Sequence, residues 1–259
     1  MSNTYTIHDI KEMLGALKKA IIEKTPFSVV CLGDAEQIFL ACPEVDTIDK
    51  IDMYLAVSGV DSSMTKLKKE IINLLPENDY VFTHTLEHKD CDPRVGKVDW
   101  AKFFYIYPEI FEYYGLKEIK LVTKVSLRYG MVTSGEFFDI LEGSKILLVG
   151  FYAPEVERRM KNSEFIKHYE KMNLHKLNIV GSIGCSETKK VGNEVYDMLE
   201  QAKKIDFDVA LLAMGIPSAY LGPKLRQEGK IAIDIGHIMS ALAGKGEKHR
   251  SYISEFDFD

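Results

Sequence analysis

Apolar residues recur along this chain at two spacings, one typical of strands and one typical of helices. Short runs rich in Val, Ile, Leu and Phe predict strands at residues 29–32, 80–83, 119–125, 145–150, 177–180, 209–214 and 230–235. Between them, apolar positions three and four residues apart predict helices at residues 7–22, 62–75, 134–141, 155–172, 192–204 and 219–228. We therefore predict an α/β protein.

The order of these elements indicates the kind of sheet. In the C-terminal half strands alternate with helices, which is typical of βαβ units and of a parallel sheet covered by helices. We predict a Rossmann-like, parallel or mostly parallel sheet with helices on both faces. The chain has no internal repeat, low-complexity segment or long linker. We therefore expect residues 1–259 to form a single domain, with a mobile tail from about Gly244.

Composition narrows the classes of partner. The chain has 259 residues, 46% of them apolar, and a formal net charge of -6. The negative charge argues against a nucleic-acid surface, which needs a basic field. The four cysteines form no C-x-x-C pair, no apolar run approaches a membrane span, and the N-terminus lacks the pattern of a secretory leader. We therefore expect a soluble cytoplasmic protein without a transmembrane segment.

The first candidate site follows the apolar run at residues 29–32. Gly33 ends this run, and the carboxylates of Asp34 and Glu36 come directly after it. If the chain stays extended, a spacing of two places both side chains on the same side of the backbone. Paired carboxylates at the end of a buried strand suit Mg²⁺ or Mn²⁺ shared with substrate phosphates. The alternative is structural, because Asp caps helices and Glu is favourable in a first helical turn.

A second group of polar residues follows the last predicted strand. Asp234, Gly236 and His237 stand at its carboxyl end, where they can share a crevice with the first pair of carboxylates. The preceding strand is followed by Gly215 and by Ser218 at a helix start, where backbone amides favour phosphate. No G-x-G-x-x-G follows a strand and no Walker lysine motif is present, so dinucleotide binding and P-loop hydrolysis are poor interpretations.

Three further segments carry candidate chemistry. Arg128, just past a predicted strand, is a candidate phosphate clamp, with a surface salt bridge as the alternative. A solvated loop explains the polar cluster after residues 80–83 better than a second metal site, because the H-E-x-x-H signature is absent. This cluster comprises His84, Glu87, His88 and Asp90. The aromatic-rich stretch at residues 100–114 is expected to be core, with a platform for sugars or bases as the alternative.

Two segments together resemble a known family. FSVVCLGDAE at residues 27–36 and LLAMGIPSAYLGPKLRQEGKIAIDIGH at residues 211–237 are similar to segments of the GT-D fold glycosyltransferases. These are bacterial enzymes that use a UDP-sugar donor and extend protein-linked or surface glycans. Their first motif is approximately Arg-Phe-Gly-Asp-Gly-Glu, and its Asp-x-Glu is held to bind the metal and the nucleotide diphosphate. The resemblance gives these roles to Asp34 and Glu36.

The resemblance also implies a function and a set of site residues. It implies a hexosyltransferase with Mn²⁺ or Mg²⁺ as cofactor, a UDP-sugar as donor and a glycan or glycoprotein as acceptor. His237 becomes a candidate general base, because imidazole ordinarily titrates near working pH; a structural histidine is the alternative. Asp234 either orients His237 or satisfies backbone amides at its strand end. The residues expected to contact the nucleotide are Gly33, Arg128, Asn193, Gly215, Ser218 and Asp234.

The chain departs from the family motif in ways that leave alternatives open. Cys31 stands where the family usually has Arg, Ala35 replaces its Gly, and the turn at Gly215 has one inserted residue. One alternative is therefore a degenerate member that binds a nucleotide sugar or a partner without turnover. Another is an unrelated metal-dependent phosphohydrolase that uses the same carboxylates. Assembly into a homo-oligomer is left open.

Overall fold

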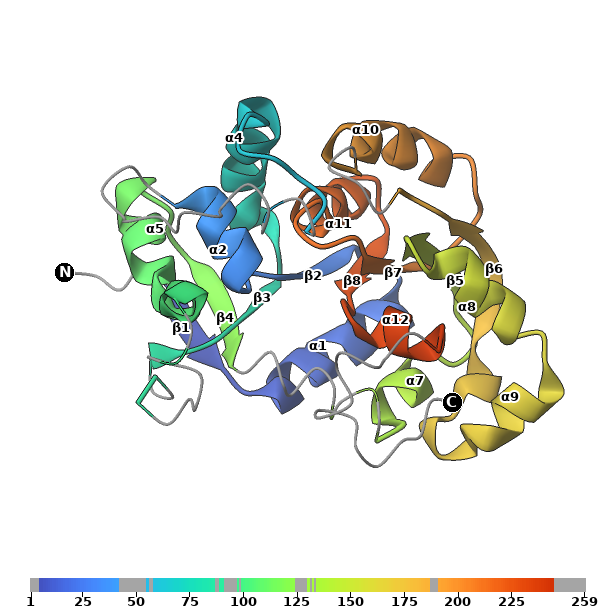
Figure 1. Ribbon diagram of the computed structural model, residues 1–259. Coiled ribbons are helices and arrows are strands. Elements are labelled where there is room, and N and C mark those ends of the chain that lie inside the picture. The colour runs from blue at the N-terminus through green and yellow to red at the C-terminus, as the bar shows by residue number, and fades with distance from the viewer. Residues whose placement is uncertain are drawn as a thin grey trace.

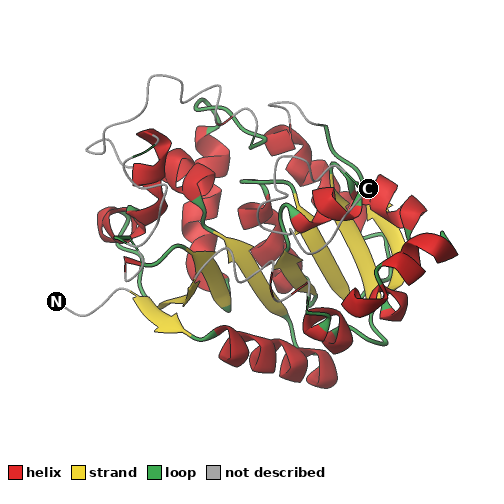
Figure 2. Cartoon of the chain, turned by 60° about the horizontal axis from the view of Figure 1, so that its bottom comes forward, coloured by secondary structure: helices red, strands yellow, loops and turns green. Residues whose placement is uncertain are grey.

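The computed structural model describes residues 5–41, 58–86, 99–123, 134–186 and 191–244, together with residues 55, 89–90, 97, 130 and 132. Within them, one eight-stranded sheet forms the middle layer, and each paired strand in it is parallel to its neighbour. Figure 2 shows the strands side by side with helices packed around them. The predicted Rossmann-like parallel sheet with helices on both faces is confirmed.

The sheet brings the two ends of the sequence together. Its strands are β1 (Tyr5–His8), β2 (Phe27–Cys31), β3 (Tyr80–Thr83), β4 (Ile119–Thr123), β5 (Lys145–Gly150), β6 (Asn178–Ile183), β7 (Val209–Ala213) and β8 (Ile231–Asp234). Across the sheet their order is β1-β4-β3-β2-β8-β7-β5-β6. β2 and β8 are therefore neighbours at the centre, with Phe27 opposite Ile231 and Val29 opposite Ile233.

Two groups of helices cover the sheet (Figure 1). One face carries α2 (Asp34–Leu40), α4 (Thr65–Leu74), α5 (Tyr107–Tyr113), α10 (Val191–Ala202) and α11 (Ser218–Gln227). The other carries α1 (Ile10–Glu23), α7 (Glu136–Ile140), α8 (Ala153–Arg159), α9 (Ser163–His168) and α12 (Ile238–Leu242). Because side chains alternate along a strand, β2 supplies both cores. Val30 packs with the first group, and Val29 and Cys31 pack with the second.

Helix α11 lies directly against both central strands. A Cβ atom at Gly222 would lie 2.7 Å from Cγ1 of Val30. Since real Cβ contacts are longer than this, glycine is what lets the helix approach β2 so closely. The helix predicted at residues 219–228 corresponds to α11. Glycine lowers helix propensity, and the close packing on β2 explains why one occurs at position 222.

Several predicted elements differ in extent from the observed ones, and for two of them the cause is a helix cap. The single helix predicted at residues 155–172 is broken, because Asn162 caps a new helix: its side chain accepts hydrogen bonds from the N–H groups of Glu164 (2.8 Å) and Phe165 (3.4 Å). The helix predicted from residue 7 begins only at Ile10, after Asp9 accepts a hydrogen bond from the N–H of Lys11 (2.7 Å). The preceding residues instead form β1, at one edge of the sheet.

Two further sequence predictions concern the C-terminal tail and a possible membrane span. The tail predicted from about Gly244 lies outside the described residues apart from Gly244 itself. No helix in the described part of the chain combines the length and the apolar character needed to cross a bilayer.

Candidate active site

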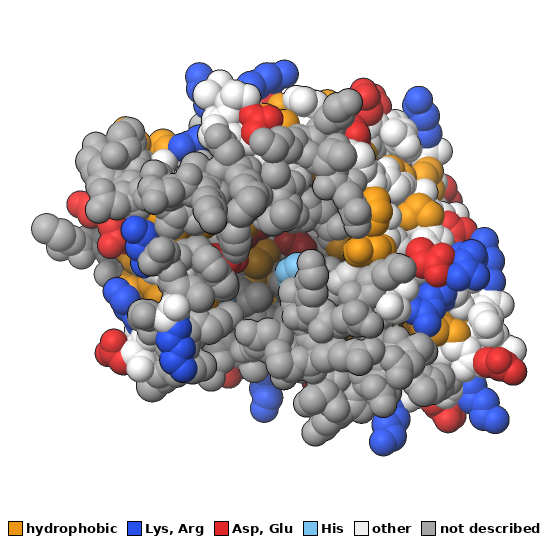
Figure 3. Space-filling model, in the orientation of Figure 1, with side chains coloured by type: hydrophobic (Ala, Val, Ile, Leu, Met, Phe, Trp, Pro, Cys, Tyr) orange, Lys and Arg blue, Asp and Glu red, His pale blue; other side chains and the backbone are white. Residues whose placement is uncertain are grey.

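The chain leaves the two central strands toward opposite faces of the sheet. After β2 it enters α2 on one face, and after β8 it enters α12 on the other. Such a divergence between neighbouring parallel strands opens a crevice at their carboxyl ends. Figure 3 shows a hollow near the middle of this face, with acidic side chains and a histidine visible inside it. The predicted meeting of the two polar segments at one sheet edge is therefore confirmed by the pairing of β2 with β8.

Asp234, the last residue of β8, is buried and joins the two central strands. Its Oδ2 accepts a hydrogen bond from the N–H of Cys31 (3.2 Å), and its Oδ1 accepts one from the N–H of Gly236 (2.9 Å). Of the two roles predicted for Asp234, the structure shows the second, because its carboxylate satisfies backbone amides. It thereby fixes the turn that precedes His237 to the end of β2.

Asp34 and Glu36 do not leave the backbone on the same side, as an extended chain would require. Helix α2 begins at Asp34, so the two residues are separated by about 200° around the helix axis. Glu36 folds back, and its Oε2 accepts a hydrogen bond from the N–H of Gly33 (2.8 Å). This contact is one half of a capping box. Glu36 is consequently buried, whereas Asp34 is half-buried at the start of the helix.

The three carboxyl groups are close enough to affect one another. Burial, followed by the negative charges of Asp234 and Asp34, raises the pKa of Glu36 from 4.5 to about 8, although backbone N–H groups oppose the rise. Of the described residues, no lysine or arginine forms an ion pair with Glu36. The crevice therefore gathers acidic side chains, and a cation placed beside Glu36 would favour the ionised form of its carboxyl group.

The carboxylate ligands suit a metal ion that is shared with a substrate. Among the described residues, no group of three or more His, Cys, Asp or Glu side chains is arranged to hold a metal ion alone. Glu36 also commits one carboxylate oxygen to Gly33. Mg²⁺ and Mn²⁺ commonly take one or two carboxylates and complete their coordination with water and substrate phosphates. Asp34 and Glu36 fit a cation shared with a substrate, and the described residues supply no all-protein cage around them.

The turn after β7 is held by internal contacts. Ser218 is fully buried, and its Oγ accepts a hydrogen bond from the N–H of Met214 (3.2 Å). The N–H of Ile216 donates to the carbonyl of Ser58 (3.2 Å). Gly215 has a φ of +67°, and a Cβ atom there would lie 2.6 Å from the Ser58 oxygen. Gly215 and Ser218 therefore stabilise a turn beside β8, and these polar groups are already used within the protein.

The other predicted site residues lie in different parts of the molecule. His237 is exposed at the start of α12, immediately after the turn that Asp234 fixes. Asn193 is exposed on α10, which packs against α11 and β6 and not among the strand ends that carry the carboxylates. Arg128, Glu87 and His88 lie outside the described residues.

A family model matches most of this chain. The model for the GT-D fold-like domain matches residues 8–242. The chain belongs to this family. A comparison with curated proteins finds no match.

Solved structures of low sequence identity have a similar fold. One is described as the highly conserved domain of unknown function 1792, which has a distinct glycosyltransferase fold. It is 17% identical to this chain with a TM-score of 0.60, and the alignment covers 96% of this chain and 83% of that chain. Another is described as a new glycosyltransferase of the same domain type from Streptococcus sanguinis. It is 15% identical with a TM-score of 0.59, and the alignment covers 95% of this chain and 85% of that chain. At these identities the likeness establishes the fold.

The departures from the family motif have simple structural consequences in this GT-D chain. Cys31 contributes its backbone N–H to Asp234, and its side chain is buried in the core with α1. Ala35 lies within α2 and is not among the residues of positive φ, so it is accommodated without strain. The change from Gly to Ala at this position therefore leaves the carboxylate helix intact.

Sequence reasoning missed Gln37, which ties the GT-D crevice to its surroundings. Gln37 is fully buried, and its Nε2 donates hydrogen bonds to the carbonyls of Leu32 (3.1 Å) and Phe104 (3.1 Å). The signal was available, because a polar residue among Ile38, Phe39 and Leu40 occupies a position expected to be apolar.

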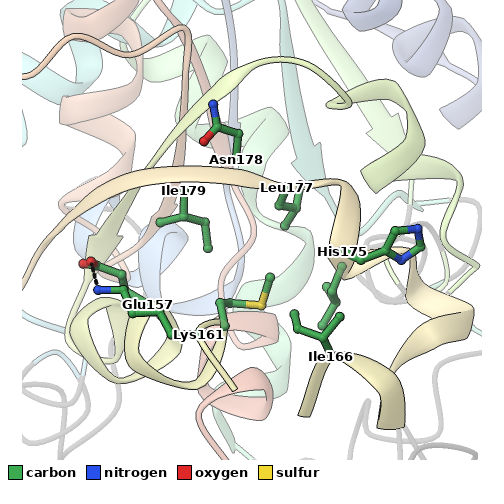
Figure 4. Close-up of a pocket in the computed structure, with 9 residues that line it drawn as sticks. Glu157, Lys161, Ile166, His175, Leu177, Asn178 and Ile179 are labelled. Atoms are coloured by element: carbon green, nitrogen blue, oxygen red, sulfur yellow. Dashed lines mark hydrogen bonds and ion pairs between the residues drawn. The ribbon is translucent and has the colours of Figure 1, made fainter. Parts of the chain in front are cut away.

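A separate pocket lies far from this crevice (Figure 4). It has a volume of about 340 Å³ and is lined by α8, α9, the start of β6 and the segments that connect them. The lining includes Lys161 after α8, Ile166 on α9 and His175 before β6. β6 is the outermost strand, separated from β8 by β7 and β5. The pocket therefore belongs to the edge of the sheet and not to the carboxylate site.

Proposed function

We propose that this chain is a metal-dependent glycosyltransferase that moves a hexose from a UDP-sugar to a glycan or glycoprotein acceptor. The observation that carries the proposal is the convergence of Asp34, Glu36 and Asp234 at the carboxyl ends of β2 and β8, in a chain of the GT-D family. A concentration of negative charge suits a substrate that arrives as a cation-chelated diphosphate.

The carboxylates have distinct parts in this proposal. Asp34, half-buried at the mouth of the crevice, and the second oxygen of Glu36 would hold Mn²⁺ or Mg²⁺, which when bound supplies positive charge against the leaving diphosphate. Asp234 is a positioning residue, because it holds the turn before His237 against β2. The crevice between α2 and α12 would exclude water from one side of the donor.

His237 is the candidate general base. It is exposed at the end of the turn beside the carboxylates, where an acceptor hydroxyl can reach its imidazole. In this role a neutral ring nitrogen would take the proton of that hydroxyl as its oxygen bonds to the sugar carbon and the bond from that carbon to the diphosphate oxygen breaks. The proposed acceptor side of the crevice is therefore the side of α12.

A second candidate is a nucleotide-sugar-binding protein without turnover. It is favoured by Cys31, because a buried thiol cannot supply the guanidinium that the family motif usually carries beside the diphosphate. This candidate predicts that UDP binds in the presence of Mn²⁺ while none of the UDP-sugars is turned over.

The test is a screen of nucleotide sugars with Mn²⁺ or with a chelator, measuring release of UDP. We expect turnover only with Mn²⁺, and a loss of at least about 100-fold in Asp34→Asn, since a group that binds the charged leaving diphosphate is removed. The matched control is Asp197→Asn, the same change at an exposed position on α10. Unchanged rates in Asp34→Asn would refute the assignment, whereas UDP binding without turnover in the wild type supports the second candidate.

A further inference from the structure

Both proposed metal ligands lie in the first turn of one short helix. α2 has seven residues (Asp34–Leu40), and an isolated helix of this length is not stable in water. Its N-cap, Gly33, has no side chain that could hold the turn. The N–H of Gly33 is bonded to Glu36, which is itself one of the two proposed ligands. The position of this turn therefore depends on contacts made by other residues of α2.

Gln37 makes such contacts from the same turn. It is fully buried, and its Nε2 donates hydrogen bonds to the carbonyls of Leu32 (3.1 Å) and Phe104 (3.1 Å). Leu32 directly follows β2, and Phe104 belongs to a 3-10 helix (Asp99–Tyr105) that packs on α2. The backbone N–H of Gln37 also donates to the carbonyl of Gly33 (3.0 Å). Gln37 thereby joins the turn that carries the carboxylates to two other parts of the chain.

The neighbouring strand holds the same carbonyl. Thr83, the last residue of β3, is fully buried, and its hydroxyl donates a hydrogen bond to the carbonyl of Leu32 (3.0 Å). The N–H of Leu32 donates to the carbonyl of Phe82 (2.7 Å), so the pairing of β2 with β3 continues to this point. The entry into α2 is therefore fixed from one side by β3 and from the other by Gln37.

The amide of Gln37 has a cost that packing alone does not explain. Its Oε1 is buried and has no hydrogen-bond partner among the described residues. A buried polar atom without a partner lowers stability. Methionine has nearly the same length and would fill this space without that cost. An amide that donates to two carbonyls is better explained by a need for one fixed orientation of α2.

We propose that Gln37 is a positioning residue that sets the affinity of Asp34 and Glu36 for their cation. The inference rests on the proposed function and deepens it, because it names the group that holds the carboxylates in place before the cation arrives. Ligands that are already ordered lose less conformational freedom on binding, which raises affinity. Residues that orient metal ligands typically change metal affinity by about 10- to 100-fold when they are replaced.

The experiment measures Mn²⁺ binding to the full chain, with and without UDP, from the electron paramagnetic resonance signal of the free ion. In Gln37→Met we expect the dissociation constant of Mn²⁺ to rise about tenfold, the lower end of that range, because Gln37 holds the helix and does not bond to the carboxylates. The number of ions bound at saturation should stay at the wild-type value. The matched control is Gln227→Met, the same change at an exposed position on α11, which should bind Mn²⁺ as the wild type does.

A second measurement needs no metal. In EDTA, amide hydrogen exchange at the N–H groups of Gly33 and Gln37 should be faster in Gln37→Met than in the wild type, because the first turn of α2 opens more often. Exchange in β5 and β7 should be unchanged. If thermal melts show that Gln37→Met does not fold, Thr83→Val decides. It keeps the shape of the side chain and removes the second donor to Leu32, so it should weaken Mn²⁺ binding by a smaller factor.

The outcomes separate this inference from the function on which it rests. An unchanged dissociation constant of Mn²⁺ in a folded Gln37→Met, or in Thr83→Val where that variant decides, overturns the positioning role and leaves the transferase proposal standing. Fewer ions bound at unchanged affinity also overturns it, because that result indicates a partly unfolded sample. Unchanged hydrogen exchange at Gly33 and Gln37 does the same. If the wild type binds Mn²⁺ neither alone nor with UDP, the metal-dependent transferase fails and the role of Gln37 fails with it.

Discussion

At both ends of β2 an aspartate accepts a hydrogen bond from a backbone N–H of the strand, but the charged groups around the two ends differ. We call these ends of the central strands the amino edge and the carboxyl edge. At the amino edge, Asp79 accepts a hydrogen bond from the N–H of Ser28 (2.9 Å), and at the carboxyl edge Asp234 accepts one from the N–H of Cys31 (3.2 Å). At the amino edge Arg226 pairs with the same carboxylate, with Nε at 2.7 Å from Oδ2. At the carboxyl edge the groups that act on Glu36 are further carboxylates.

The difference contrasts a charge that is balanced within the protein with one that is not, as the proposed function requires of Glu36. Asp79 and Arg226 neutralise each other within the protein, so that edge is complete in the chain alone. Glu36 is buried among like charges, which is unfavourable for the isolated chain and favourable once a cation enters. Sites that bind charged ligands commonly give up stability in this way.

The largest expected effect concerns Glu36→Gln in the absence of metal. The pKa of Glu36 is raised to about 8 in the folded protein, so the folded form keeps a proton that the unfolded form releases above its ordinary pKa of about 4.5. Stability should therefore fall as pH rises from about 5 to 8. Gln is neutral and can still accept from Gly33, so the variant should be more stable than the wild type at pH 8, by roughly 3–5 kcal/mol.

Urea unfolding in EDTA at several pH values measures this effect. The comparison variant is Glu23→Gln, an exposed glutamate at the end of α1, which should retain the wild-type pH dependence. A Glu36→Gln variant whose stability falls with pH as steeply as that of the wild type would show that Glu36 carries no trapped proton. The contrast between the two edges would then be lost.

An intermediate effect is expected at the amino edge. Asp79→Ala removes the acceptor of the Ser28 N–H and leaves Arg226 without its partner, which should cost about 1–3 kcal/mol because the pair is partly exposed. UDP release should remain at the wild-type rate per folded molecule. A cycle with Arg226→Met isolates the pair. Loss of turnover in a folded Asp79→Ala would mean that the amino edge also serves the reaction.

The smallest effect is expected for Ser218→Ala. Its hydroxyl accepts from the buried N–H of Met214, so the variant should lose about 1 kcal/mol of stability. Since Ser218 is fully buried, UDP affinity measured by calorimetry should not change. A tenfold weaker affinity at unchanged stability would restore the phosphate contact that the sequence suggested for this residue.

Much of the fold was predictable because strands and helices in parallel sheets have clear patterns. Residues 80–83 and 145–150 form strands with the predicted ends, since buried runs of apolar residues stop at polar ones. The break at Asn162 was not predicted, because apolar periodicity continues across it while a single side chain caps the next helix. Capping depends on backbone geometry that spacing alone does not specify.

The sequence predicts which strand ends form the candidate site, but it does not predict the directions in which their side chains point. Asp34 and Asp234 meet because parallel strands place their carboxyl ends at one edge. That Glu36 turns back to Gly33 depends on where α2 begins, one residue after the glycine. Ser218 shows the same limit, because a hydroxyl at a helix start can face a ligand or its own turn, and here it bonds to Met214.

The position of β8 has a consequence for how the protein acquires its activity. Among the described residues this strand is the last in chain order; it lies between β2 and β7, and Asp234 stands 203 positions after its partner Cys31. Until ribosomal synthesis has delivered it, the strands before β5 and those from β5 onward cannot be joined into one sheet. A nascent chain in which α2 has already folded therefore lacks the crevice beside Asp34 and Glu36 until β8 is inserted next to β2.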